Sequence, residues 1–379
     1  MTSVLETLQF LAQPLNISKD IRKIYIDEWT FRIHYRTTTI LLLLFSALLS
    51  FREYLGDHIK CVHMQEDLSD TPVIPRSVLE TYCFISTTFT VPYEKSQRYK
   101  IDRRLSTLVG GPGYIAGKNE RVYHAYYQWV PFFLFFQALM FYAPHAFWKA
   151  YDSGKVRNLV QDLSMKKYIL EKSGSSEKCS HTSQIARYLV QSKGHHVGWA
   201  AAYVLAEFGN LVVVLGNMYL TDYFLGREFS SFGPKVLQLI DEDPESRVDP
   251  MTKVFPRVTK CNLNTFGPSG SIQNFDALCV LSSNILNEKI FTFLWFWFVL
   301  VAVITILSFM YRIAFMFSFG MRLRALGSAK DFPEKSQGKN VVAHLGRSDW
   351  LVLRLLRLNM DSVTFYKLIR NIHEEMMHN

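Results

Sequence analysis

The chain has 379 residues, of which 49% are hydrophobic and 15% aromatic, and its formal net charge at pH 7 is +9. Lysines and arginines occur in every polar segment instead of being concentrated on one arm or helix, so the positive charge does not indicate a nucleic-acid-binding protein. The mean hydropathy of +0.05 averages over long apolar and long polar stretches, and this alternation predicts the fold.

Four apolar windows are long enough for a helix to cross a bilayer, which needs about 20 residues. They predict membrane spans over residues 33–52, 126–148, 199–224 and 290–317. Polar segments cover residues 1–32, 53–125, 149–198, 225–289 and 318–379, and the parts 348–358 and 362–376 show the apolar periodicity of helices. Residues 1–29 lack the apolar region and cleavage site of a secretory signal peptide, so we expect the N-terminus to stay in the cytosol.

The cysteines predict which segments lie outside the cell. Cys61 and Cys83 fall in the segment 53–125, and Cys261 and Cys279 fall in the segment 225–289. Disulfides persist in oxidising compartments, so both segments are expected to be extracellular loops, with both termini and the segment around Cys179 in the cytosol. Four cysteines allow three pairings, and the sequence alone does not choose between them. The predicted fold is mainly α, a four-transmembrane-helix bundle with two disulfide-stapled extracellular loops and a helical cytoplasmic domain.

Polar faces on two segments are candidates for lining a water-filled path. The N-terminal segment has capping-box spacing at Ser3 and Glu6 and apolar residues on one helical face. Its opposite face carries Thr2, Glu6, Gln9 and Gln13. In the first span, a stripe at helical spacing contains Arg36, Thr39, Ser46 and Ser50, flanked by Arg32 and Glu53. A pore lining explains both faces. The alternatives are an N-terminal helix resting on the bilayer surface, and charged side chains of the first span that reach the interfaces while its hydroxyls bond their own backbone.

The third span has a second polar stripe, for which contacts between helices are favoured over a pore role. The stripe consists of Glu207, Asn210, Asn217 and Thr221, and the small residues Ala202, Gly209 and Gly216 recur on nearly the opposite face. Small residues let helices approach closely, and amides bond across helix interfaces. The fourth span has few polar side chains, so we expect it to face lipid, with Arg312 marking its inner end.

No pattern typical of catalysis or metal binding accompanies the histidines. They have no second ligand at a recognised spacing, and the sequence has no nucleophile elbow, zinc signature or paired-carboxylate arrangement. The glycines within residues 110–117 lack the preceding strand and following helix of a phosphate-binding loop, so we interpret them as turns. We therefore expect a protein that is not an enzyme and that uses no cofactor and no metal.

The start of the second span carries a specific motif. Tyr126, Tyr127, Gln128, Trp129, Val130 and Pro131 strongly resemble the YYQWV signature of the innexins, the invertebrate gap-junction family. The stretches 31–35, 56–57, 255–261 and 287–298 also look like innexin sequence. The resemblance therefore extends over nearly the whole chain.

The resemblance implies an architecture. Innexin-like subunits form a ring around a pore, which we expect to contain eight copies, as a homo-oligomer or as a heteromer with other innexins. The N-terminal helix and the first span would line the pore, with Thr2, Glu6, Gln9 and Gln13 at its narrow entrance. Disulfides would join Cys61 to Cys279 and Cys83 to Cys261, which would brace the two outer loops as one docking surface for the hemichannel of an opposing cell.

The predicted function is that of a gap-junction channel subunit in the plasma membrane, which passes ions and small metabolites between adjacent cells and contacts membrane lipid. One alternative is an unpaired, pannexin-like hemichannel that releases small molecules. A second is a four-span adhesion or scaffold protein without conduction. Both predicted outer loops lack an N-glycosylation sequon, which is compatible with close docking.

Overall fold

The computed structural model describes residues 24–56, 59–63, 75–90, 122–160, 178–241, 254–267, 269–326 and 335–378, which form two compact units. The spanning unit consists of Trp29–Tyr151 and Ala202–Ala314, and the helical unit contains Asp152–Ala201, Phe315–Asn379 and the segment that ends at Glu28. The expected pore-entrance residues Thr2, Glu6, Gln9 and Gln13, and the glycines within residues 110–117, lie outside the described residues.

Four helices of the described chain are long and apolar enough to cross a membrane, which confirms the predicted fold class. The first helix combines α2 (Trp29–Arg32), the π-helical segment η1 (Ile33–Thr38) and α3 (Thr39–Leu55). The other three are α6 (Val130–Asp152), α9 (Val197–Phe224) and α12 (Ser282–Phe317). Because α12 begins at Ser282, the fourth helix extends beyond the apolar window of residues 290–317.

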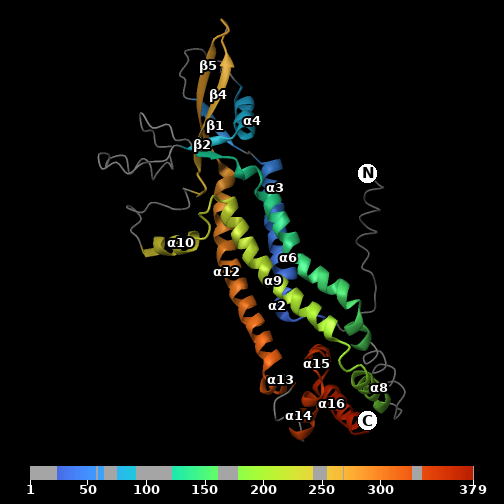
Figure 1. Ribbon diagram of the computed structural model, residues 1–379. Helices are drawn as coiled ribbons and strands as arrows, with labels where there is room; N and C mark the ends of the chain where they lie inside the picture. Colours follow the sequence, from blue (N-terminus) through green and yellow to red (C-terminus); the bar gives the residue numbers. More distant parts are fainter. Residues whose placement is uncertain are drawn as a thin grey trace, which may run out of the picture. The chain divides into compact units, whose positions relative to one another are not determined.

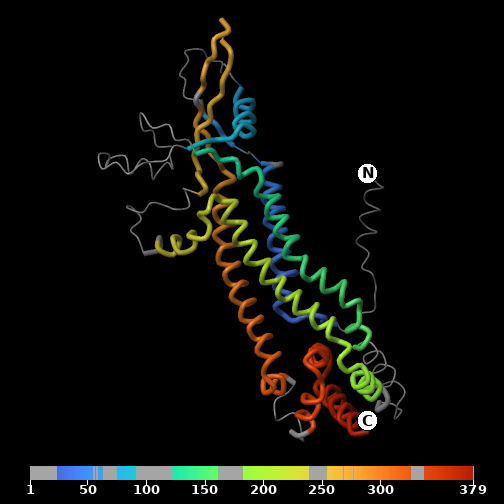
Figure 2. Tube along the Cα trace, in the orientation of Figure 1, coloured from blue at the N-terminus to red at the C-terminus, as the bar shows by residue number. Residues whose placement is uncertain are grey.

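The four long helices run side by side within the spanning unit (Figure 1 and Figure 2). Their shared core contains fully buried residues from all four, namely Leu42, Leu134, Phe141, Val214 and Phe298. Other faces of the same helices leave large apolar side chains exposed, among them Leu44, Phe136, Leu215 and Leu307. Such faces suit lipid or neighbouring protein. One face of α12 is thus part of the bundle core, so the expectation that the fourth span simply faces lipid is incomplete.

A five-stranded antiparallel sheet forms a lobe at one end of the spans (Figure 1). The strand order is β1 (Lys60–His63), β5 (Ile272–Val280), β4 (Val258–Phe266), β2 (Thr88–Thr90) and β3 (Val122–His124). The helix α4 (Arg76–Ser86) contacts β1 and β4, and α10 (Phe232–Asp241) precedes the hairpin of β4 and β5. These segments were expected to be extracellular loops, so the sheet is an additional feature of the structure.

Buried and more exposed residues alternate along the hairpin of β4 and β5. In β4, Thr259, Cys261 and Leu263 are buried, whereas the residues between them are only half-buried. In β5, Ala277 and Cys279 are buried in the same way. Successive side chains of a strand point to opposite faces, so this alternation gives the sheet one packed face. That face forms the lobe core together with Ile59, Leu79, Cys83, Tyr127 and Leu281.

The helical unit is built from short amphipathic helices. They are α8 (Lys178–Gln191), α13 (Phe319–Leu326), α14 (Lys335–His344), α15 (Arg347–Asn359) and α16 (Ser362–His378). The helix α16 packs against α8 and α14, and α13 packs against α14 and α15. Buried leucines such as Leu353 and Leu368 supply the core. The unit is further held by a hydrogen bond between His196 Nδ1 and Asp349 Oδ1, at 2.9 Å, and by an ion pair between Arg354 and Glu28.

Candidate functional site

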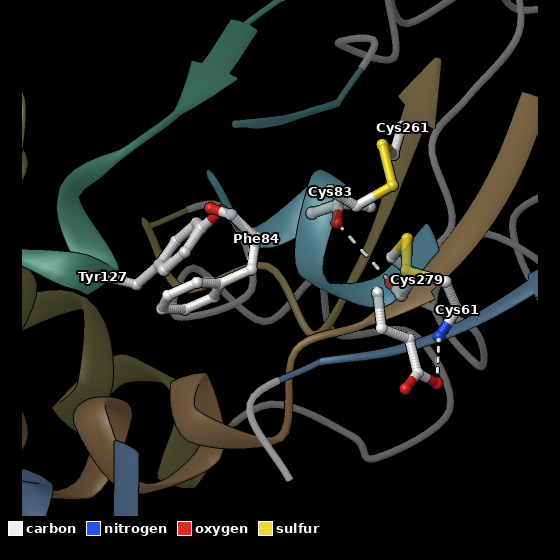
Figure 3. Close-up of a disulfide and its surroundings, with 8 residues drawn as sticks. Cys61, Cys83, Phe84, Tyr127, Cys261 and Cys279 are labelled. Atoms are coloured by element: carbon white, nitrogen blue, oxygen red, sulfur yellow. Dashed lines mark hydrogen bonds between the residues drawn. A yellow bond between two sulfur atoms is a disulfide. The ribbon is translucent and has the colours of Figure 1, made fainter. Parts of the chain in front are cut away.

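Two disulfides tie the lobe together (Figure 3). One joins Cys61 of β1 to Cys279 of β5, and the other joins Cys83 of α4 to Cys261 of β4. All four cysteines are buried, and the sulfur atoms of Cys61, Cys83 and Cys279 lie within 4.8 Å of one another. Because these sulfurs are bonded in disulfides, the cluster is a double staple and not a metal site. The pairing is the one that the family resemblance implies.

The two disulfides link parts of the chain that are far apart in sequence. Cys61 and Cys279 are separated by 218 residues, and Cys83 and Cys261 by 178 residues. Each bond therefore crosses from the first polar segment between spans to the second. Both segments become one body, with its strands in a fixed register in which Cys61 lies opposite Cys279.

The Tyr126–Pro131 motif connects this lobe to the second span. Tyr126, Tyr127 and Gln128 form a single 3₁₀ turn, η2, directly before α6. Tyr127 is buried in the lobe core, where its ring lies 5.6 Å from that of Phe84 (Figure 3). The hydroxyl of Tyr127 and the amide of Gln128 both donate to the carbonyl oxygen of Phe84. The ring of Tyr126 instead packs against Phe255, with 5.9 Å between centroids. The motif thus holds the lobe against the end of the spans.

The remaining motif residues act at the start of the helix itself. Trp129 is 62% exposed, which suits an interfacial tryptophan at a membrane surface. Pro131 lies in the first turn of α6, where its missing N–H costs no helical hydrogen bond. Its carbonyl oxygen accepts a hydrogen bond from the hydroxyl of Ser46 at 2.8 Å. Val130 is fully buried in the bundle core.

The first span has the predicted polar residues, but they do not share one open face. Ser46 is only 8% exposed and donates to Pro131, and Thr39 donates weakly to the carbonyls of Ala138 and His34. Both residues therefore form hydrogen bonds to the second span, and Thr39 is only half-buried. Ser50 is half-buried, whereas Arg36 is exposed. Arg36 is thus the residue of the first span that best fits a position along a water-filled path.

The π-helical segment explains why the stripe is interrupted. A π turn closes i to i+5 hydrogen bonds and holds more residues than an α turn. Residues before Thr38 are therefore rotated away from the positions that a period of 3.6 predicts. The segment is stabilised by the hydroxyl of Thr38, which donates to Ile33 O at 2.9 Å, and by His34, whose Nε2 lies 2.7 Å from Thr305 Oγ1.

The polar stripe of the third span lies between helices, as the favoured interpretation holds. Glu207, Asn210, Asn217 and Thr221 are all buried. Gln137 of α6 donates to the hydroxyl of Thr221 at 2.8 Å. On the other face, Gly209 faces Pro144 of α6, and a Cβ placed at Gly209 would make an ordinary contact with that proline at 3.6 Å.

Glu207 forms a bidentate ion pair with Arg312 of α12. Arg312 Nε and Nη2 lie 2.8 Å from the two carboxylate oxygens, and the exposed fractions are 2% for Arg312 and 6% for Glu207. The guanidinium also lies 5.1 Å from the ring centroid of Tyr203. Arg312, which the sequence predicts to mark the inner end of the fourth span, is buried against α9. A charge at this depth requires a partner, and Glu207 supplies it.

Comparison with known proteins assigns the chain to a family. The family model described as Innexin matches residues 27–376. Innexin inx2 of Drosophila melanogaster is 37% identical over 358 residues, which is 94% of this chain and 93% of the relative. Innexin inx3 of the same organism is 36% identical over 92% of this chain and 85% of the relative, and Innexin shaking-B is 34% identical over 93% and 91%.

The chain belongs to the innexin family. Innexins are gap-junction channel proteins, so this innexin is a multi-pass membrane protein and a subunit of an oligomeric gap-junction channel. The family is a family of channels and not of enzymes. The role of this innexin as a channel subunit depends on two parts of the structure, the disulfide-stapled lobe and the four spans.

Sequence reasoning missed two features of this innexin that matter for the site. One is that Arg312 is the partner of Glu207. The sequence shows only that Arg312 lies near the end of an apolar segment. The other is the π-helical segment, for which the cluster of β-branched and aromatic residues at 33–38 gave no specific signal.

Proposed function

We propose that this innexin docks with a hemichannel of the opposing cell through the lobe formed by β1–β5 and α4, which lies outside the cell. The observation that carries this proposal is the double disulfide staple. Disulfides of this kind are retained in oxidising compartments, and they give the lobe the rigidity that a docking surface needs.

The end of the β4–β5 hairpin supports docking through this lobe. Phe266 and Ile272 face each other across the strands next to the turn, and their exposed fractions are 79% and 66%. Large apolar side chains in water favour contact with another protein surface. Figure 1 shows the hairpin projecting from the ends of the spans, where such a surface is accessible.

The pore is proposed to follow the first span and the N-terminal segment with Thr2, Glu6, Gln9 and Gln13. Arg36 supports this proposal because it is exposed within the first membrane-spanning helix, Trp29–Glu53. A charged side chain inside a span is stable where it faces water or a bundle interior. Arg36 and the half-buried Ser50 are thus the described residues assigned to the pore.

The subunits are proposed to form a ring of eight, either of this chain alone or mixed with other innexins. Exposed apolar faces on the spans, such as those of Leu44 and Leu215, leave surface for neighbouring subunits. Images of purified particles viewed along the pore axis test the number directly. Eight-fold symmetry is expected, and any other symmetry would contradict the octamer.

Recordings from paired and single cells separate docking from the two alternatives. Cells expressing this innexin in pairs should show current across the junction, because docked lobes close a continuous path. Current in single cells without junctional current would favour the unpaired hemichannel. Silence in both arrangements, with the protein detected at the surface, would favour the adhesion or scaffold protein and contradict the proposal.

A further inference from the structure

Two arginines of the helical unit lie just past the end of the fourth span. The helix α12 ends at Phe317, and α13 begins at Phe319. Arg322 of α13 has its Cζ atom 5.8 Å from the ring centroid of Phe319, and Arg347 at the start of α15 has its Cζ atom 5.8 Å from that of Phe317. The helices α13 and α15 pack against each other, and Arg322 and Arg347 lie near enough for their positive charges to interact.

Neither guanidinium has an anionic partner among the described residues. Other arginines of this unit do: Arg354 pairs with Glu28 at 2.7 Å and Arg370 with Glu374 at 2.8 Å. In contrast, the buried Nε–H of Arg322 donates to no acceptor in the described part of the chain. The nearest acid along α15, Asp349, is already bound to His196 Nδ1 at 2.9 Å and to the backbone N–H of Gly194 at 3.0 Å.

Two unpaired positive charges held close together are costly in free energy. Burial lowers the pKa of Arg322, and the positive charge of Arg347 lowers it further. Arg347 is also the first residue of α15, whose N-terminus has no side-chain cap, so its free N–H groups add partial positive charge. A bound anion would offset the burial of Arg322, the repulsion between the two arginines and the partial positive charge of the helix N-terminus.

The surroundings favour a lipid as the source of that anion. Phe317 is the last residue of a membrane-spanning helix, and it is 75% exposed. The apolar window of residues 290–317 ends at this residue, so Phe317 lies where the span meets the lipid headgroups. Arg347 lies over the Phe317 ring, so its guanidinium is at the depth where lipid phosphates are found. Guanidinium groups bind phosphate oxygens through paired hydrogen bonds.

We infer that Arg322 and Arg347 bind the phosphate of an anionic lipid headgroup at the membrane surface next to the end of α12. The phosphate contacts both guanidinium groups beside the exposed ring of Phe317. The lipid thereby holds α13 and α15 together at Phe317.

The test uses the full-length oligomer purified in detergent and its melting temperature during titration with short-chain lipid. The probe is dioctanoyl phosphatidic acid, with dioctanoyl phosphatidylcholine and sodium phosphate as separate arms. A ligand that binds only the folded state raises the melting temperature in proportion to its occupancy. We expect phosphatidic acid to raise the melting temperature at concentrations at which the other two probes have no effect.

The test variant and its control each lose two positive charges. Arg322→Gln with Arg347→Gln should shift the midpoint for phosphatidic acid at least about tenfold higher. Arg324→Gln with Arg370→Gln removes two exposed arginines of the same unit and should leave the midpoint unchanged. Arg347 is exposed, so Arg347→Gln alone tests the site even if the double variant does not fold, and it should weaken binding several-fold.

Three outcomes would overturn the inference. Equal midpoints for Arg347→Gln and the control variant would show that this site does not bind the lipid. An equal effect of phosphatidylcholine would show that the acyl chains, and not the anionic phosphate, are recognised. Saturation by sodium phosphate at the same concentration as phosphatidic acid would assign the site to a soluble phosphate compound.

Discussion

At the scale of single residues, the Glu207–Arg312 pair shows how a charge is retained inside the bundle. The two carboxylate oxygens and two guanidinium nitrogens form parallel hydrogen bonds of 2.8 Å, and both side chains are more than nine-tenths buried. Removing two charges from water is costly, and the pair offsets this cost only while both partners are present. Each residue is therefore expected to depend on the other.

Replacing either partner alone should be strongly destabilising. Arg312→Leu leaves an uncompensated carboxylate at Glu207, and Glu207→Leu leaves an uncompensated guanidinium, each at a cost of about 3–5 kcal/mol. The double variant, with both positions changed to Leu, should cost less than either single variant. Thermal denaturation of the detergent-solubilised oligomer measures all four members of the cycle. Additive losses in the double variant would show that the two residues do not stabilise each other.

The sequence alone indicates only one member of this pair. Glu207 was singled out because an ionisable residue in a span requires a partner. Its partner lies 105 residues away on another helix, and periodicity along one helix carries no information about contacts between helices. The same limit applies to Ser46, whose polar position was predicted but whose acceptor, the carbonyl of Pro131, was not.

His124 makes the stability of the lobe depend on pH. It is buried in β3, its Nε2 lies 2.7 Å from Thr90 Oγ1 of β2, and burial lowers its pKa to about 4. The unfolded chain has the ordinary pKa of 6.5, so it binds a proton first as the pH falls. The lobe should therefore lose stability between pH 6.5 and pH 4, by roughly 3 kcal/mol at the lower limit.

A comparison of melting temperatures from pH 7 to pH 4 checks this prediction. His124→Gln retains a hydrogen-bonding side chain that does not titrate, so its melting temperature should fall less steeply than that of the unmodified chain. Parallel curves for the two proteins would show that protonation of His124 does not determine the acid sensitivity.

At the scale of secondary structure, the long helices were predicted and the short strands were not. About 20 consecutive apolar residues are a strong signal, which explains why four spans were found. The strands β1, β2 and β3 have only three or four residues, too few for an alternating pattern to be distinguished from a loop. The strands β4 and β5 do alternate between buried and more exposed residues on either side of a turn, so the sequence carries a weak signal for this hairpin.

The short helix α10 depends on one glycine for its contact with α12. A Cβ atom added at Gly233 would lie 2.3 to 2.4 Å from ring atoms of Trp295, closer than any real contact. Gly233→Ala should therefore destabilise the protein by about 1–3 kcal/mol through overpacking. Gly320→Ala is the control, because a Cβ atom there meets nothing within 4 Å.

Thermal denaturation distinguishes the two glycine variants. The melting temperature should fall for Gly233→Ala and should stay the same or rise for Gly320→Ala, since alanine favours a helix more than glycine does. Adding Trp295→Leu to Gly233→Ala should recover part of the loss. An unchanged melting temperature for Gly233→Ala would mean that α10 is not held against Trp295.

At the scale of the whole molecule, the disulfides determine how two distant segments form one body. The number of cysteines and their location in two polar segments predicted that staples exist, but three pairings were open. Only the resemblance to innexins selected one. The two disulfides join cysteines that are 218 and 178 positions apart in the sequence, and the sheet brings these cysteines together. The sheet itself was not predicted.

Loss of one staple should abolish coupling between cells. Cys61→Ser frees Cys279 and removes a bond that closes a long loop, which typically costs roughly 2–5 kcal/mol. Junctional conductance between paired cells, with surface biotinylation to verify delivery to the membrane, measures the effect. Cys179→Ser is the matched control and should couple normally. Normal coupling in the Cys61→Ser variant would show that the staple is dispensable for docking.

The most direct test of the account is the accessibility of the cysteines in intact cells to a membrane-impermeant maleimide. Without reduction, no cysteine should be labelled. After treatment with an impermeant reductant, Cys61, Cys83, Cys261 and Cys279 should be labelled, and Cys179 should react only when the membrane is permeabilised. Labelling of Cys179 in intact cells, or protection of the other four until permeabilisation, would place the lobe on the inner side and contradict the proposed docking.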